Sequence, residues 1–181
     1  MPKGAKLRIL FEDEGRFGRI SDHRRCWAPL PTRPIVGSQI VREYVYGFFA
    51  VSPFDGRCSA LILPWSDNYT MSVFLKHTSE IFRKDFCVMF LDKASWHTTR
   101  QLKIPANIRL IPLPPHSPEL NPVEHVWEYL RENFFGNKIF SSLDAVADSL
   151  FEGLRSLVLN AEVLKSLTNY HWLNTLCMTS K

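Results

Sequence analysis

Residues 7–14 read LRILFEDE, an apolar run that ends in a cluster of acids. The apolar side chains alternate, which predicts a β-strand over residues 7–13 that carries Asp13 at its end. A second apolar run, CVMFLD, predicts a buried strand over residues 86–91 followed directly by Asp92. If these two strands lie side by side and parallel, both carboxylates meet at the edge where open α/β sheets place their functional sites.

A third carboxylate follows a proline-rich connection. Residues 115–124 read PHSPELNPVE, and the prolines exclude a helix before Asn121. Asn121 can cap a helix in which Pro122 takes the first position and Glu124 lies in the first turn. Apolar residues then recur at helical spacing as far as Phe134, which predicts an amphipathic helix.

Three acids brought to one edge of a sheet would repel one another unless a divalent cation neutralised them. Mg²⁺ prefers oxygen ligands and keeps several waters, so the set predicts two Mg²⁺ ions, with Mn²⁺ as a substitute, and chemistry on phosphodiesters. Each acid also has a purely structural interpretation: Asp13 as a polar strand end, Asp92 as the start of a turn, and Glu124 as part of a capping box. Their joint occurrence where apolar elements meet loops favours a site.

The remaining patterns predict a mixed sheet. Further strands are expected over residues 40–51, 57–63 and 108–113, and helices over 71–83, 141–157 and 161–167. The first two of these strands should form an antiparallel hairpin, and Asn68 or Thr70 should cap the first helix. The expected fold class is therefore α/β, a five-stranded mixed sheet flanked by helices on both faces. We expect one domain over residues 1–181, of which 158–181 form a helical C-terminal tail.

Composition supports a globular protein. The chain has 181 residues with 45% apolar content, enough for one well-packed core. No window approaches the roughly 20 apolar residues of a transmembrane helix, and the N-terminus enters a strand pattern without a signal peptide, so a cytoplasmic location is expected. The four cysteines form no Cys-x-x-Cys pair, which favours buried free thiols over zinc or disulfides.

Positive charge is concentrated near the N-terminus, within an overall net charge of +4. Residues 1–50 contain nine Lys/Arg and five Asp/Glu. Five arginines lie in a Gly- and Pro-rich stretch that is expected to be an exposed loop: Arg16, Arg19, Arg24, Arg25 and Arg33. They could bind phosphates, although a solvated surface is an equally good interpretation.

Three stretches resemble the catalytic domain of mariner-type DDE transposases, specifically their bacterial insertion-sequence branch. These are FEDEG at 11–15, LDKASWH at 91–97 and, the most specific, PHSPELNPVEHVW at 115–127. The resemblance covers roughly residues 5–155. It implies an RNase H-like fold with Asp13, Asp92 and Glu124 as the catalytic and metal-binding triad. It also implies metal-dependent cleavage at transposon ends, followed by strand transfer into target DNA.

The same resemblance implies supporting residues. His97 matches a motif histidine expected near the metals or the DNA backbone, although capping of a turn is equally well supported. Lys93 departs from the Asn or Gly common at that position, and it could contact phosphate or weaken metal binding. Asn121 shapes the turn that presents the third acid, and His116 and Arg16 are further predicted DNA-binding or site-shaping residues.

Partners also follow from the resemblance. They are transposon terminal inverted repeats and target DNA, a second copy of the chain in an active homodimer, and no membrane. Relatives carry an N-terminal helix-turn-helix region that has no counterpart before the first strand here, so a separately encoded helix-turn-helix half is a further possible partner. The expected location is the bacterial cytoplasm, in association with the nucleoid.

Two other functions remain open from the sequence. One is a catalytically inactive, transposase-derived module that binds DNA or protein, and the other is a stand-alone RNase H-type nuclease. Among the tryptophans, Trp127 is expected in the core because it lies in helical register with apolar residues, whereas Trp96 is the candidate for stacking on a base.

Overall fold

The computed structural model describes residues 4–93, 101–115 and 117–173. Its strands are β1 (Lys6–Ile20), β2 (Ile40–Val51), β3 (Cys58–Leu63), β4 (Asp85–Leu91) and β5 (Ile108–Pro112). Its helices are α1 (Asn68–Ile81), α2 (Val123–Leu130), α3 (Leu143–Val158) and α4 (Ala161–Thr168). A 3₁₀ turn, η2 (Pro118–Leu120), precedes α2, and a π-helical turn, η3 (Arg131–Phe135), continues it.

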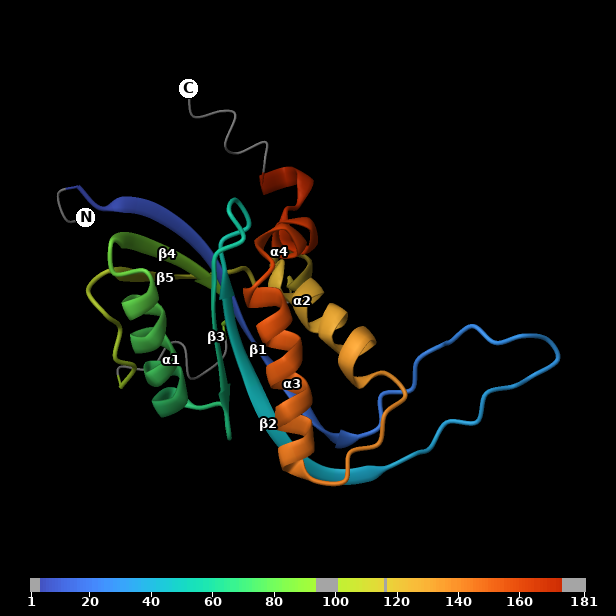
Figure 1. Cartoon of the computed structure of the whole chain (residues 1–181). Coiled ribbons are helices and arrows are strands. Elements are labelled where there is room, and N and C mark those ends of the chain that lie inside the picture. The colour runs from blue at the N-terminus through green and yellow to red at the C-terminus, as the bar shows by residue number, and fades with distance from the viewer. Residues whose placement is uncertain (1–3, 94–100, 116, 174–181) are drawn as a thin grey trace.

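The five strands form one mixed sheet in the order β3-β2-β1-β4-β5. β1, β2 and β3 pair antiparallel, whereas β1, β4 and β5 are parallel. Helix α1 covers one face, and α2, α3 and α4 cover the other (Figure 1). The predicted hairpin, the parallel pairing of the two acid-bearing strands and the helices on both faces are all confirmed.

Each face of the sheet has its own apolar core. On the α1 side, Phe48 and Met89 from the sheet pack against Met71 and Phe74 of the helix. On the other side, Phe49 packs against a larger cluster from α2, α3 and α4, which includes Trp127, Leu130, Leu150, Leu154 and Leu164. Because neighbouring residues of a strand point to opposite faces, adjacent Phe48 and Phe49 serve the two cores.

Strand β1 is longer than the alternation over residues 7–13 predicted. It runs to Ile20, because β2 pairs with it along most of its length, from Phe11 opposite Val51 to Ile20 opposite Ile40. Asp13 therefore lies within a strand and not at its end. The expectation that Arg16 and Arg19 belong to an exposed loop is wrong, since both are part of this strand.

The connection from β1 to β2 leaves the body of the protein as a long arm (Figure 1). The arm carries fully or almost fully exposed apolar side chains, Trp27, Leu30 and Ile35. Its base is attached to the segment after η3, where Asn137 accepts a hydrogen bond from the backbone of Arg24 at 2.9 Å and donates one back at 3.0 Å. The predicted exposure of Arg25 and Arg33 is confirmed.

Several local predictions need correction. Helix α1 is capped by Asp67, whose carboxylate accepts from the backbone of Thr70 at 2.8 Å, and not by Asn68 or Thr70. Helix α3 is capped by Ser142, not by the residue before it. The proline-rich connection contains the 3₁₀ turn η2, where no helix was expected. Pro118 is compatible with this turn because it occupies the first position, where a proline is tolerated.

Three of the four cysteines can be compared with the structure, and one of them, Cys58, is half-buried. Cys87 is buried in β4 as expected, whereas Cys26 is exposed in the arm, so the expectation of buried thiols is wrong there. Burial raises the pKa of the Cys87 thiol to about 11. Among the helices of the described residues, none is long and apolar enough to cross a membrane.

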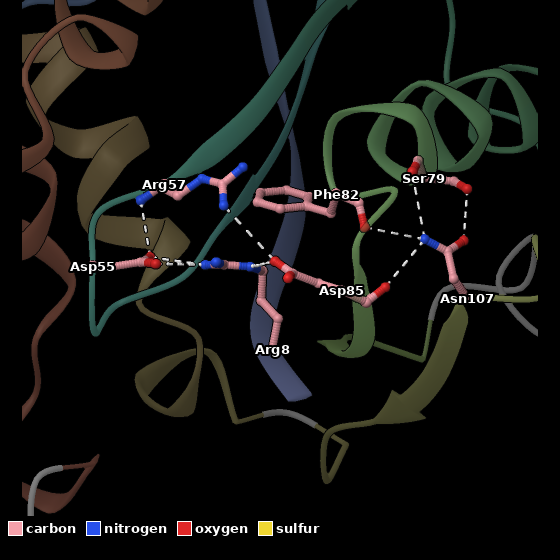
Figure 2. A network of polar contacts seen from close by, with 7 residues as sticks. All are labelled: Arg8, Asp55, Arg57, Ser79, Phe82, Asp85 and Asn107. Atoms are coloured by element: carbon pink, nitrogen blue, oxygen red, sulfur yellow. Dashed lines mark hydrogen bonds and ion pairs between the residues drawn. The ribbon is translucent and has the colours of Figure 1, made fainter. Parts of the chain in front are cut away.

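A partly buried polar network fixes the beginning of the parallel strands (Figure 2). The guanidinium of Arg8 donates to Asp85 and, at 2.7 and 2.9 Å, to Asp55, and its carbon lies 4.9 Å from the centre of the Phe82 ring. Arg57 lies over the same ring at 5.0 Å and within 3.8 Å of Asp85. The network joins β1, β4 and the turn between β2 and β3.

The amide of Asn107 extends this network to β5 (Figure 2). Its nitrogen donates to the carbonyl oxygens of Ser79, Phe82 and Asp85 at 3.3 to 3.4 Å. Its oxygen accepts from the hydroxyl of Ser79 at 2.6 Å. The end of α1 and the starts of β4 and β5 are therefore held by one side chain.

We predict that Arg8→Met lowers the free energy of unfolding by about 3 to 5 kcal/mol, because it leaves the buried Asp85 carboxylate without its closest cation. Asp55→Asn should cost only about 1 kcal/mol, since that carboxylate is 37% exposed. Urea denaturation of both variants measures the difference. Equal losses would show that Asp85 does not depend on Arg8.

Candidate acidic active site

The three predicted acids line one cavity of about 400 Å³. Asp13 comes from the middle of β1, Asp92 follows the last residue of β4, and Glu124 lies in the first turn of α2. Lys93, Asn121 and residues of the proline-rich connection complete the lining. Side chains separated by up to 111 positions in sequence thus face the same space.

The parallel register explains how Asp13 and Asp92 meet. β1 and β4 pair with a constant offset from Lys6 opposite Asp85 to Phe11 opposite Phe90. The same offset continued by two residues places Asp13 beside Asp92. The pairing ends at Phe11 and Phe90 and β4 ends at Leu91, so both acids lie beyond the paired segment, where they line the cavity.

Asp13 is bound to the helix that carries Glu124. The indole nitrogen of Trp127 donates a hydrogen bond to Oδ2 of Asp13 at 2.8 Å. The indole packs edge-on to Phe17 and Phe49, with ring centres 5.8 and 6.0 Å away, and it is 1% exposed. The hydrogen bond therefore has a fixed direction.

Glycine makes room for this tryptophan. Gly15 lies opposite Gly47 in the β1–β2 pairing, and both face the indole. A Cβ atom at residue 15 would lie 2.8 Å from Cδ2 of Trp127, well inside contact distance. Two glycines on one face of the sheet thus allow α2 to approach closely enough for its tryptophan to reach Asp13.

Asn121 connects the start of α2 to β1. Its side-chain nitrogen donates to the backbone oxygen of Glu12 at 2.8 Å, and its oxygen accepts from the backbone of Val123 at 3.2 Å. The prediction that Asn121 shapes the turn before the third acid agrees with these bonds. The helix itself begins at Val123, with Pro122 rather than Asn121 as its cap residue.

The surroundings of Asp13 raise its cost of ionisation. Burial raises the pKa of Asp13 to about 8, and the nearby negative charges of Glu124, Glu14 and Asp92 act in the same direction. The hydrogen bond from Trp127 opposes this shift because it favours the charged carboxylate. At neutral pH, Asp13 is mostly protonated until a positive charge enters the cavity.

The donor set of the cavity suits a hard divalent cation. All three acids supply carboxylate oxygens, which Mg²⁺ and Mn²⁺ accept, and the crowding of negative charge around Asp13 is what a cation would relieve. Among the described residues, no three acids, histidines or cysteines are already close enough together to form a metal cluster. The residues therefore fit the cation in the kind of donor that they supply.

The other predicted residues divide into three groups. Lys93 and Asn121 line the acidic cavity. Arg16 lies on β1 but lines a different cavity. His97, His116 and Trp96 lie outside the described residues, so their predicted roles stay predictions.

One functional contact escaped sequence reasoning. Trp127 was expected in the core, which its burial confirms, but its hydrogen bond to Asp13 was not foreseen. The spacing in the sequence could have indicated this contact, because a residue three positions after Glu124 lies on the same side of a helix. An indole N–H at that position is a donor that points toward the acids.

Residues 8–147 match the model of the DDE superfamily endonucleases. A protein of Sinorhizobium fredii (strain NBRC 101917 / NGR234), described as uncharacterized protein y4pE/y4sA, is 44% identical over 107 residues, which are 57% of this chain and 77% of that protein.

Solved structures of the Mos1 transposase have the same fold. The Mos1 mariner paired-end complex with Mn matches with a TM-score of 0.59 and 15% identity, and the Mos1 strand transfer complex with 0.58 and 16%. Each match covers 90% of this chain, which spans only 55 to 56% of the length of the Mos1 chains. The similarity confirms the predicted RNase H-like fold, and the matched family model shows that this chain belongs to the DDE superfamily endonucleases.

Proposed function

We propose that the chain is the catalytic domain of a transposase that cleaves DNA at transposon ends and joins the freed 3′ hydroxyl to target DNA. The observation that carries the proposal is the convergence of Asp13, Asp92 and Glu124 on one cavity. The Mos1 structures of similar fold include a paired-end complex with a left transposon end. Homodimer formation and a separately encoded helix-turn-helix partner stay predictions.

The three acids would hold two Mg²⁺ ions, with Mn²⁺ as a substitute. Such ions, when bound, activate the attacking water or hydroxyl and stabilise the leaving oxygen. Asp13 is the central ligand in this proposal, because the charges of both Glu124 and Asp92 act on it and because Trp127 holds it by a hydrogen bond. Lys93, at the rim of the cavity, is positioned to attract a phosphate.

Asp13 must lose its proton before it can bind a cation. Its pKa of about 8 means that cation binding at neutral pH competes with a proton. The hydrogen bond from Trp127 lowers that pKa and therefore favours binding. Trp127 thus increases the affinity for the cation through its hydrogen bond to Asp13, and it need not contact the metal to do so.

We predict that Asp92→Asn lowers Mn²⁺-dependent nicking of a supercoiled plasmid by at least about 100-fold, since a carboxylate ligand is lost. Asp148→Asn is the matched control, because it makes the same charge change at an exposed position of α3. Gel quantification of nicked plasmid over time gives the rates.

Three outcomes separate the functions. Nicking that survives Asp92→Asn would mean that the activity does not belong to this site. DNA binding without nicking by the wild-type protein would favour the inactive binding module. Faster cutting of the RNA strand in an RNA–DNA hybrid than of duplex DNA would identify an RNase H-type nuclease.

We further predict that Mn²⁺ affinity, measured by calorimetry, rises by about tenfold per pH unit from pH 6 and levels off above about pH 8. The sign follows because the proton that blocks Asp13 is removed as pH rises toward its pKa. Trp127→Phe should shift the plateau to higher pH, since it removes the bond that lowers this pKa.

Trp27→Phe, in the exposed arm, is the matched control and should leave the pH profile unchanged. A Trp127→Phe profile identical to the wild type would show that the indole does not adjust the affinity.

A further inference from the structure

A second cavity lies along the open edge of β1. Strand β4 pairs with β1 only as far as Phe11, so within the described residues the rest of β1 has a neighbouring strand on the β2 side alone. A hollow of about 320 Å³ borders this edge. We call it the basic edge pocket, lined by Arg16, Phe17, Gly18, Ile20, Ser21, Asp22, Arg24, Tyr44, Arg131, Phe135 and Phe140.

Two of its arginines are held by aromatic rings. The guanidinium carbon of Arg16 lies 4.6 Å from the centre of the Tyr44 ring, and that of Arg131 lies 5.6 Å from the centre of the Phe17 ring. Ring contacts of this kind orient a guanidinium without neutralising its charge. Each guanidinium therefore has a ring against one of its faces, while the N–H groups at its edge stay available as donors.

Neither of these arginines forms an ion pair with a carboxylate of the described chain. Arg24, in the same pocket, differs because it pairs with Asp22 at 3.0 Å and with Glu128. The Asp22 carboxylate is thus already matched by a cation. Glu132, which does not line the pocket, also lies 3.9 Å from Arg24. Among the residues that line the pocket, Asp22 is the one carboxylate, so the lining is net positive through Arg16 and Arg131.

Both arginines lie on the elements that carry catalytic acids, and at similar distances from them. Arg16 is three residues beyond Asp13, about 10 Å along a strand, and it reaches the pocket at the open edge from the other face of the sheet. Arg131 is seven residues beyond Glu124, about 10 Å along a helix. Beyond these points a parallel bridge joins Asp22 to Gly136, so the two elements lead in the same direction.

We infer that the basic edge pocket binds two neighbouring phosphates of the DNA strand that is cut, one at each of these arginines, about three nucleotides from the bond at the acids. About 10 Å corresponds to three steps of roughly 3.4 Å along one strand of a duplex. Guanidinium groups donate to phosphate oxygens through paired N–H groups, which the ring contacts leave free. The inference rests on the proposed function, because it takes DNA as the substrate.

The test is the salt dependence of binding to a fluorescein-labelled DNA duplex, followed by anisotropy in EDTA so that no cleavage occurs. A plot of log affinity against log salt concentration has a negative slope, and each lost phosphate contact should make that slope less steep by about 0.9. Arg16→Gln and Arg131→Gln should each lose about that amount, and the double variant about twice as much. Between 50 and 200 mM salt, the wild-type affinity should then fall about 12-fold more than that of the double variant.

Two controls accompany the test. Arg109→Gln removes the same charge from an exposed position on β5, at the other edge of the sheet, and should keep the wild-type slope. Arg16→Lys with Arg131→Lys keeps the charge and should restore most of the slope, which separates lost contacts from damaged folding.

The outcomes distinguish this inference from the proposed function. A double variant with the wild-type slope, or an Arg109→Gln variant with an equal loss, would overturn the phosphate site while DNA cleavage stood. A wild-type protein that binds no duplex at any salt concentration would overturn the proposed function and the site together.

Discussion

The hydrogen bond between Trp127 and Asp13 is the contact on which the rest of the site depends. It joins the central strand of the sheet to the helix that carries Glu124, across 114 positions of sequence. It also lowers the pKa of a carboxylate whose pKa is raised by burial and by three neighbouring acids. A group of like charges can be assembled in a folded protein only when such contacts offset part of their repulsion.

The pairing of β4 with β1 positions the second acid, Asp92. Asp92 reaches the cavity because β4 keeps one register with β1, and that register begins beside the buried pair of Arg8 and Asp85. A slip by one residue would turn every side chain of β4 to the opposite face. The ion pair lies at the start of the segment over which β1 and β4 pair, and the acids lie just beyond the end of that segment. A structural network at the start therefore protects the geometry beyond the end.

Much of this architecture was predictable from the sequence, and the failures have physical causes. Alternating apolar residues predicted the start of β1, but Gly15 and Gly18 disfavour strands when taken alone, and their place in β1 depends on β2, which is distant in sequence. Asp67, Asn68 and Thr70 can all cap a helix, and only the folded backbone selects Asp67.

The candidate site was predictable to a similar degree. The three acids followed from strand ends, a proline-rich turn and a family resemblance. The burial of Trp127 followed from helical register, but the direction of its N–H depends on how closely α2 approaches Gly15 and Gly47. Local sequence patterns describe an element well, and they say little about the distance between two elements that meet only after folding.

The separation of these partners along the chain has a consequence for protein synthesis. Ribosomes add residues in order, and Asp13 emerges long before Glu124 and Trp127 are made. A nascent chain that ends before α2 has two acids at most and lacks the indole that favours the ionised state of Asp13. Such a chain cannot complete the acidic cavity, which forms only after Glu124 and Trp127 have been translated and α2 has packed against β1.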